Sequence, residues 1–239
     1  MKVIDFRLGL RTLFNIVIVL IFVQSTEGQR KSYEIIDNDS IKVYFDYLGH
    51  PTSITTYEFC RYGRLNSQGN EFQGIIKDFD IHGKSVFQGF VINGVLEGKA
   101  LFFYENEKIK IQGFYSNNRR SGIWTYYYRN GQIRMKIKYA DEEYLLEYYK
   151  RSGKQLVQNG NGSIKYSSSA YIANIKGEVK NGLRSGVWKN SKFEEHYDAE
   201  GRFIKGYNKN VKKPYYETIF LYSYPIPNEY SKIGYRIAE

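Results

Sequence analysis

Alternation of apolar and polar residues predicts a β-strand near the centre of the chain. From Ile133 to Tyr139 every second residue is apolar, and Arg134, Lys136 and Lys138 occupy the positions between. Successive side chains of a strand point to opposite faces, so this period of two indicates a strand with one face in the core and one in solvent.

The residues before this strand predict a hairpin of the same kind. Two aromatic-rich strands are predicted at Ile111–Tyr115 and Ile123–Tyr128, joined by a turn cluster over 116–122. The next connection, Arg129–Gln132, contains an Asn-Gly pair. This pair favours a tight type I′ turn, because both residues accept positive φ angles.

This unit of two strands and two turns recurs with a period of 24 residues. One copy is too small to bury its apolar face alone, so neighbouring copies must stack to form a continuous core. The interval is kept by the glycines Gly74, Gly98 and Gly122, by the turn positions Gly83, Glu107 and Gly131, and by the Gln-Gly pairs at 88–89 and 112–113. The aligned copies place apolar residues in columns: Phe87, Ile111 and Met135; Phe79, Phe103 and Tyr127; Phe102 and Tyr126.

The best copy, Ile111–Gly131, resembles the MORN-type repeat, and more closely the bacterial MORN-variant repeats that are also labelled antitoxin-like. Their pattern is G-x-Y-x-N-G-x-x-x-G-x-W-x-Y-Y-x-x-x-G. Residues 87–107 fit less closely, with Ala100 at the tryptophan position and Glu107 at the turn glycine, whereas residues 175–188 match the first half. The resemblance covers roughly Phe72 to Gly206 and implies a scaffold repeat.

The period and the resemblance together predict an all-β fold. We expect an elongated meander of stacked β-hairpins, a MORN-like repeat sheet or solenoid, with N- and C-terminal caps. The predicted parts are a signal peptide at 1–28, an N-terminal cap at 29–71, the repeat domain at 72–206 with a divergent insert at about 141–170, and a C-terminal cap at 207–239.

The first 28 residues have the order of charges and apolar residues that is typical of an export signal. Lys2, Arg7 and Arg11 precede an apolar run from Leu13 to Val23, which is short for a membrane span. An uncleaved N-terminal anchor is the alternative. The sequence therefore predicts export to the periplasm, the outer surface or the medium. This location conflicts with the cytoplasmic toxin partner that the antitoxin-like label implies, so that role is not adopted.

Outside the best copies the pattern predicts a few further elements. A strand is expected at Ser40–Asp46. Thr52–Tyr62 is expected to form a short helix, with a strand as the alternative. Gly201 lies farther from Gly186 than Gly131 lies from Gly122, which predicts about six inserted residues in the last copy. A further strand is predicted at 144–149, and prolines at 214, 225 and 227 bracket the segment 215–224, which would be an edge strand.

Composition narrows the functional classes. The chain is 42% hydrophobic and 17% aromatic, which excludes a disordered protein. Its formal net charge is +10, which favours anionic partners, although lysines that solvate a sheet face would give the same value. The single cysteine, Cys60, permits no intramolecular disulfide or cysteine-based metal site, and we expect it to be buried.

No catalytic pattern emerges from the polar residues. His50 and His82 lie in predicted turns, and His196 has no second histidine at metal-ligand spacing. Asp78 and Asp80 would share one strand face, where a solvated position is expected. We therefore predict no enzyme activity, no cofactor, no metal and no small-molecule substrate.

The basic residues of the repeat form the candidate binding face. In the 24-residue register Lys110 stacks over Arg134, and Gln112 stacks over Lys136, opposite the apolar ladder. Such a face could hold lipid headgroups, glycans or an acidic peptide. The alternative is that the tryptophans only pack between copies. The candidate residues are Lys110, Arg119, Arg120, Trp124, Arg134, Lys136, Lys138, Arg184 and Trp188.

Two functions follow as expectations. The first is an exported, non-enzymatic scaffold that binds an unidentified protein of the cell envelope. The second is a binder of anionic lipid or envelope glycan through the basic and aromatic face. The export signal disfavours nucleic acid as a partner despite the charge.

Overall fold

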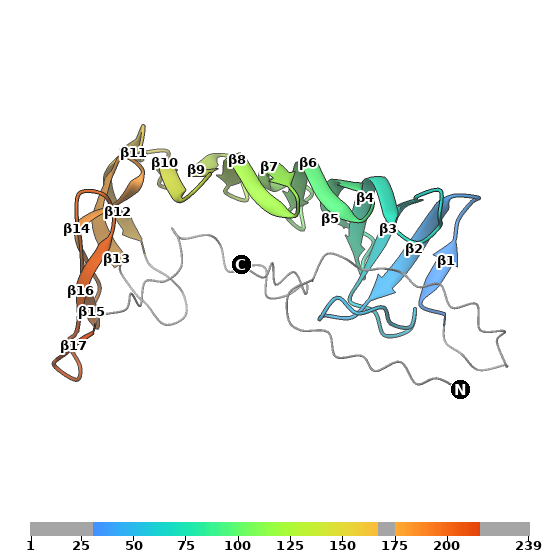
Figure 1. Cartoon of the computed structure of the whole chain (residues 1–239), viewed down its shortest axis with the longest axis horizontal. Helices are drawn as coiled ribbons and strands as arrows, with labels where there is room; N and C mark the ends of the chain where they lie inside the picture. The colour runs from blue at the N-terminus through green and yellow to red at the C-terminus, as the bar shows by residue number, and fades with distance from the viewer. Residues whose placement is uncertain (1–30, 167–174, 216–239) are drawn as a thin grey trace. The chain divides into compact units, whose positions relative to one another are not determined.

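The protein is all-β, as predicted. The computed structural model describes residues 31–166 and 175–215, which form seventeen strands of one sheet (Figure 1). The strands follow one another as an antiparallel meander, so the expected succession of hairpins is confirmed. The predicted signal peptide and the predicted strand beyond Tyr215 lie outside the described residues. No helix long and apolar enough to cross a bilayer is found among the residues described.

The chain divides into two compact units, the first ending at Gly98 and the second beginning at Lys99. The first unit contains β1 (Tyr33–Ile35), β2 (Ser40–Phe45), β3 (Phe59–Leu65), β4 (Phe72–Asp80) and β5 (Ser85–Ile92), and β6 (Val95–Phe103) crosses the boundary. The second unit continues with β7 (Ile109–Ser116), β8 (Arg119–Tyr127), β9 (Ile133–Tyr139), β10 (Glu143–Tyr149), β11 (Gln155–Gln158), β12 (Asn161–Tyr166), β13 (Ile175–Lys180), β14 (Leu183–Lys189), β15 (Phe193–Tyr197), β16 (Phe203–Asn208) and β17 (Lys213–Tyr215).

The predicted core columns are present. Phe87, Ile111 and Met135 are each almost completely buried, and so are Phe102 and Tyr126. The column of Phe79, Phe103 and Tyr127 is only half-buried, because these side chains point to the opposite face of the sheet. We call this second face the open face. It carries the residues that alternate with the core positions, and in β9 these are Arg134, Lys136 and Lys138.

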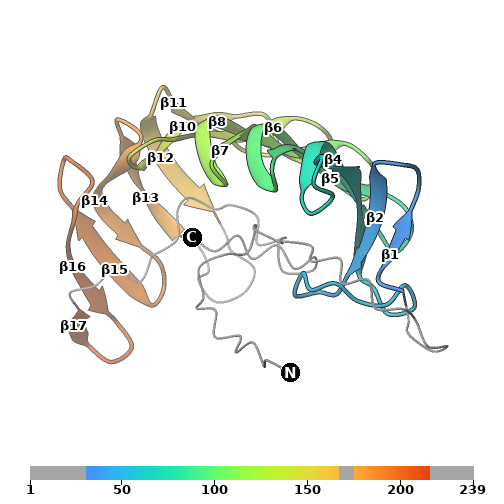
Figure 2. The same cartoon turned by 45° about the vertical axis from the view of Figure 1, so that its right-hand side comes forward.

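The glycine that recurs in the repeat marks a β-bulge. Gly122 has a φ of 66°, and the glycines at the matching positions 74, 98 and 186 also have positive φ angles. The register between β7 and β8 shifts opposite Gly122, because Gln112 pairs with Thr125 whereas Phe114 pairs with Ser121. Three residues of β8, from Gly122 to Trp124, therefore lie opposite Gly113 alone, so β8 carries two extra residues at the bulge. Extra residues bend and twist a strand, and β7 and β8 are strongly twisted (Figure 2).

The turns differ from the predicted type. At Arg129–Gln132 the expected type I′ turn is wrong, because only Gly131 has a positive φ. The backbone instead closes from Tyr128 to Gln132 with two hydrogen bonds, which makes a longer turn with one left-handed residue. The two-residue turn with positive φ at both positions lies at Asn117-Asn118, inside the segment predicted as a broader turn cluster. As a result β8 begins at Arg119, four residues earlier than expected.

The helix predicted at Thr52–Tyr62 is wrong. The backbone N–H of Thr56 donates to the Ser53 carbonyl in a single turn, and β3 then begins at Phe59. Side-chain hydroxyls explain the difference, because the Ser53 hydroxyl accepts a hydrogen bond from the Thr55 backbone. Serine and threonine compete in this way with helical hydrogen bonds.

The insertion predicted in the last copy is also wrong. Tyr139 pairs with Gly122, and Tyr197 pairs with Gly186, so Tyr197 is the counterpart of Tyr139. The hairpin after Gly186 is therefore shorter than the hairpin after Gly122. Gly201, which was aligned with Gly131, belongs to the following turn between β15 and β16.

Candidate interaction surface

Two tryptophans occupy equivalent places in the core of the second unit. Trp124 is 0% exposed and lies over the backbone of Gly113, and its indole N–H donates to the Phe114 carbonyl at 3.1 Å. Trp188 repeats the arrangement over Gly177, with its N–H donating to a carbonyl at 2.9 Å. Because both indoles are fully buried, neither can contact a ligand at the surface.

Two of the candidate arginines belong to these buried clusters. Arg120 lies 4.9 Å from the ring of Trp124 and donates to the Tyr139 hydroxyl at 2.9 Å. Burial raises the pKa of Tyr139, and the positive charge of Arg120 opposes this rise. Arg184 stands in the same relation to the second tryptophan, at 4.9 Å. These arginines therefore complete the polar side of the core rather than extend a surface patch.

The other candidate residues lie on or next to the open face. Lys136 forms an ion pair with Glu147 at 3.1 Å, and Tyr149 also donates to Glu147 at 3.1 Å. Lys138 is exposed and pairs across the strands with Ile123. Lys110 and Arg134 lie at the strand ends, each 5.8 Å from the ring of a tyrosine, and Arg119 is exposed beside the Asn117-Asn118 turn.

Large apolar side chains also stand on the open face, which the sequence analysis did not single out. In the second unit Phe114 is 52% exposed and Ile123 is 51% exposed. In the first unit Ile75 and Phe90 are direct cross-strand partners, exposed by 56% and 40%. Their alternation with core residues could have identified these exposed positions from the sequence, since Phe114 is flanked by the core positions Gly113 and Tyr115.

The acidic pair of the first unit does not lie where it was expected. Asp78 is completely buried and accepts two hydrogen bonds from the Arg61 guanidinium, at 2.8 and 2.9 Å. Burial raises the pKa of Asp78, and the paired Arg61 counteracts the rise. The predicted solvated position is therefore wrong for Asp78. Asp80 instead accepts hydrogen bonds from backbone N–H groups of its own turn.

The remaining titratable candidates do not converge on one site. His50 lies 3.5 Å from Asp46 in an exposed turn, and His196 lies 3.2 Å from Glu194 on β15. His82 is exposed in the turn after β4, and Cys60 is buried as predicted. Within residues 31–166 and 175–215, no group of three His, Cys, Asp or Glu side chains could hold a metal ion.

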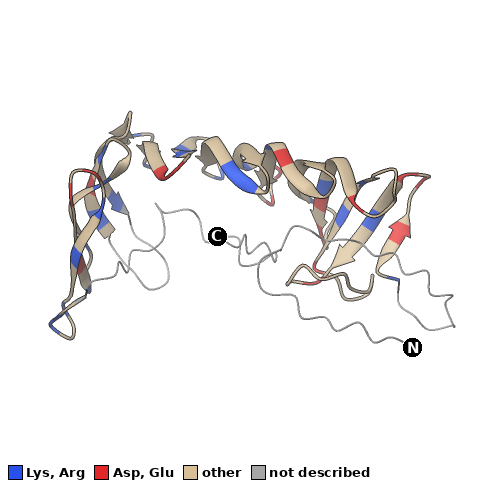
Figure 3. Ribbon diagram, in the orientation of Figure 1, with Lys and Arg blue, Asp and Glu red and all other residues tan. Residues whose placement is uncertain are grey.

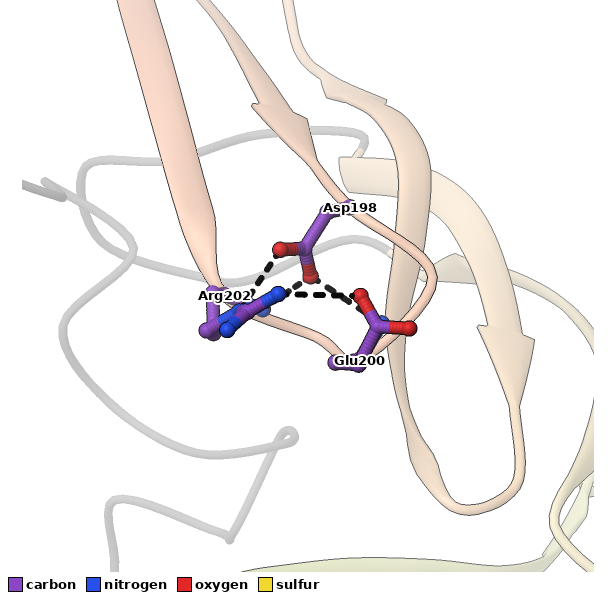
Figure 4. A network of polar contacts seen from close by, with 3 residues as sticks. All are labelled: Asp198, Glu200 and Arg202. Carbon is purple, nitrogen blue, oxygen red and sulfur yellow. Dashed lines mark hydrogen bonds and ion pairs between the residues drawn. The ribbon is translucent and has the colours of Figure 1, made fainter.

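One network of charged side chains closes a turn of the second unit. Between β15 and β16, Arg202 donates to Asp198 at 2.7 Å and to Glu200 at 3.1 Å (Figure 4). Asp198 also accepts the backbone N–H groups of Glu200 and Arg202, so it closes the turn. Desolvation alone would raise the pKa of Asp198, but the hydrogen bonds and the positive charge of Arg202 together lower it. Lysine and arginine recur on the strands of the second unit, among uncharged and some acidic residues (Figure 3).

No protein-family model matches the sequence, and a search among curated proteins finds no significant match.

Proposed function

We propose that this protein is an exported, non-enzymatic interaction scaffold whose open face binds a protein of the cell envelope. The observation that carries the proposal is the exposure of Phe114 and Ile123 beside Lys138 on rigid, paired strands. Single exposed apolar residues are ordinary on protein surfaces, but large ones that share a face with charged side chains are typical of protein-binding sites.

The geometry of the second unit supports a protein partner. Phe114 and Ile123 stand on adjacent strands on either side of the bulge at Gly122, so their side chains share one face. Lys138 lies directly opposite Ile123 on the next strand and adds a positive charge to the same patch. A partner surface with apolar and acidic side chains would complement both features.

The first unit offers a comparable patch of its own. Ile75 and Phe90 pair directly on its open face, and Ile92 is exposed farther along β5. Lys77 pairs with Gln88 on the same two strands, so the apolar pair again has a cationic neighbour. Each unit alone therefore presents a small mixed apolar and basic surface.

Crosslinking in the native envelope tests this function. The full chain of 239 residues, with its predicted export signal and a C-terminal tag, would be expressed in its native host, crosslinked in the envelope, solubilised and captured. We expect one envelope protein in near-stoichiometric amount, and we expect the Phe114→Thr and Ile123→Thr variants to lose it. Ile204→Thr, which changes an exposed strand residue of the same unit, is the matched control. Recovery that is equal for all variants would refute the role of this face.

A second candidate function is binding of anionic lipid or envelope glycan through the basic residues of the open face. The observation that favours it is the row of Arg134, Lys136 and Lys138 on β9, in which only Lys136 has a carboxylate partner among the described residues. This binding would weaken steeply with salt. Charge reversal at Lys110, Arg134 and Lys136 should abolish binding to anionic vesicles or isolated glycan, and unchanged binding would eliminate this candidate.

A further inference from the structure

Tyr128 holds two arginines at one end of the β8–β9 hairpin. Its hydroxyl donates to the Tyr149 carbonyl at 2.7 Å, so the ring is fixed to the next hairpin. The guanidinium of Arg134, from β9, and that of Arg151, from the β10–β11 turn, each lie 5.8 Å from the centre of the ring. We call Tyr128, Arg134 and Arg151 the edge cluster.

The edge cluster carries positive charge that the described residues do not neutralise. Neither Arg134 nor Arg151 forms an ion pair with a carboxylate in the part of the chain that the structure describes. The Nε–H of Arg134 is buried and has no acceptor there. Two cations beside one ring, neither paired with a carboxylate, leave positive charge that a bound anion would neutralise.

The preceding copy contains the same arrangement with its charge partly compensated. The Tyr104 hydroxyl donates to the Tyr127 carbonyl at 2.6 Å, and Lys110 and Arg129 lie 5.8 and 5.6 Å from the Tyr104 ring. Here, however, Glu105 lies 3.8 Å from Arg129. The two copies therefore share a scaffold, and only the edge cluster lacks the carboxylate.

The surroundings of the edge cluster favour anions of high charge. Arg151 is exposed in the turn Lys150–Lys154, which also contains two lysines and no acidic residue. These charges raise the local concentration of an anion. A guanidinium presents a planar fork of N–H groups that matches two oxygens of a phosphate or sulfate. Arg151 is exposed, so contact with the aromatic ring leaves its fork available to a ligand, whereas at Arg134 the Nε–H is buried and only the terminal N–H groups would take part.

We propose that Tyr128, Arg134 and Arg151 form a binding site for a tetrahedral oxyanion, the phosphate or sulfate group of an envelope polymer or of a lipid headgroup. The site goes beyond the scaffold function, because it lies at the hairpin end and uses neither Phe114 nor Ile123. This site is distinct from the basic open face, because it consists of two arginines beside one tyrosine. Of these three residues only Arg134 is among the candidate residues of the open face.

The test measures binding of three probes to the folded chain from residue 29 to residue 239. Fluorescent polyphosphate represents a phosphate polymer, heparin represents a sulfated polymer, and vesicles of phosphatidylglycerol diluted in phosphatidylcholine represent a headgroup source. We expect at least one probe to bind, with affinity that falls about tenfold in Arg151→Gln, as expected for the loss of one charged hydrogen-bonding contact. Arg134→Gln with Arg151→Gln should abolish binding.

Two controls separate a specific site from diffuse attraction. Arg129→Gln removes the same charge from the compensated copy and should change affinity less than twofold. Arg151→Lys keeps the charge but loses the fork, and should restore binding only in part. Equal losses for Arg129→Gln and Arg151→Gln, full recovery in Arg151→Lys, or no binding of any probe would each overturn the proposal.

The identity of the responsive probe assigns the source of the oxyanion. Binding to vesicles alone assigns a lipid headgroup, and binding to polyphosphate or heparin assigns a polymer. Phe114→Thr should retain this binding even if it loses the protein partner, so the two functions can fail separately. Far-ultraviolet circular dichroism and thermal unfolding of each variant show whether the sheet is intact.

Discussion

Replacing Gly113 by alanine tests how the core of the second unit is assembled. A Cβ atom at this position would lie 2.1, 2.3 and 2.5 Å from the Cδ2, Cε2 and Cγ atoms of Trp124. These atoms form the fused rigid part of the indole, which is fully buried and held by its hydrogen bond to the Phe114 carbonyl. Either the tryptophan or β7 must therefore move.

The expected cost follows from three terms. Overpacking of a core destabilises by about 1–3 kcal/mol. A lost indole hydrogen bond adds about 1 kcal/mol. Alanine recovers about 0.5 kcal/mol, because it is less flexible than glycine in the unfolded chain and in a strand. We expect Gly113→Ala to lower the free energy of unfolding by about 1.5–3.5 kcal/mol, a large part of the stability of an ordinary domain.

Urea unfolding followed by tryptophan fluorescence and circular dichroism measures this cost. Gly122→Ala is the matched control, since no atom lies within 4 Å of its Cβ position and only its φ of 66° opposes alanine. That conformation costs about 1 kcal/mol. Gly177→Ala should behave like Gly113→Ala, because its Cβ would lie 2.2 Å from Trp188. If Gly113→Ala cost no more than Gly122→Ala, packing of tryptophan on glycine would not be a main determinant of the stability of this core.

Three further predictions concern single side chains. Glu107 has a φ of 62°, so Glu107→Gly should stabilise the protein by about 0.5–1 kcal/mol in urea unfolding, and a loss of stability would contradict this account. Burial raises the pKa of Tyr139 in the folded protein. Its contribution to folding stability is therefore complete below the unfolded pKa of about 10 and is lost as the pH rises through the folded pKa. Tyr139→Phe should flatten the alkaline decline of the urea midpoint, and an unchanged decline would exclude this tyrosine as its cause. Asp78→Leu should cost about 3–5 kcal/mol because it leaves the Arg61 charge buried and uncompensated. Asp78→Leu combined with Arg61→Met should cost less in the same double-mutant cycle, and equal costs would show that the charge is relieved by other means.

The regular part of the fold could be predicted from the sequence, because the core requires apolar residues at positions that recur with a fixed period. Ile111 and Met135 must meet equivalent neighbours, so both positions remain apolar, and the strand at Ile133–Tyr139 was predicted with its observed bounds. The turns were harder to predict. The Asn130-Gly131 pair permits a type I′ turn, but the number of residues between the paired ends of β8 and β9 selects a longer one.

The candidate site was only partly accessible. The sequence named Arg120 and Trp124, and Arg184 and Trp188, among the candidate residues, and the structure brings each pair together at 4.9 Å. Adjacency alone does not tell whether such a pair lies in the core or at the surface, because that depends on the strands that cover it. Arg151 was missed for another reason: it follows the point at which the 24-residue period breaks, so no alignment of copies brings it next to Tyr128.

The way in which the copies differ points to where specificity can reside. Core columns keep apolar residues, since each must fill the space left by its neighbours. The open face is not bound by that requirement, and its equivalent positions 90, 114 and 138 carry phenylalanine, phenylalanine and lysine. Positions 75, 99 and 123 carry isoleucine, lysine and isoleucine. All six side chains are exposed, so these changes alter the surface without disturbing the core. A partner that binds one hairpin would meet a different combination of apolar and basic groups on the next, and substitutions at these positions should change partner choice before they change stability.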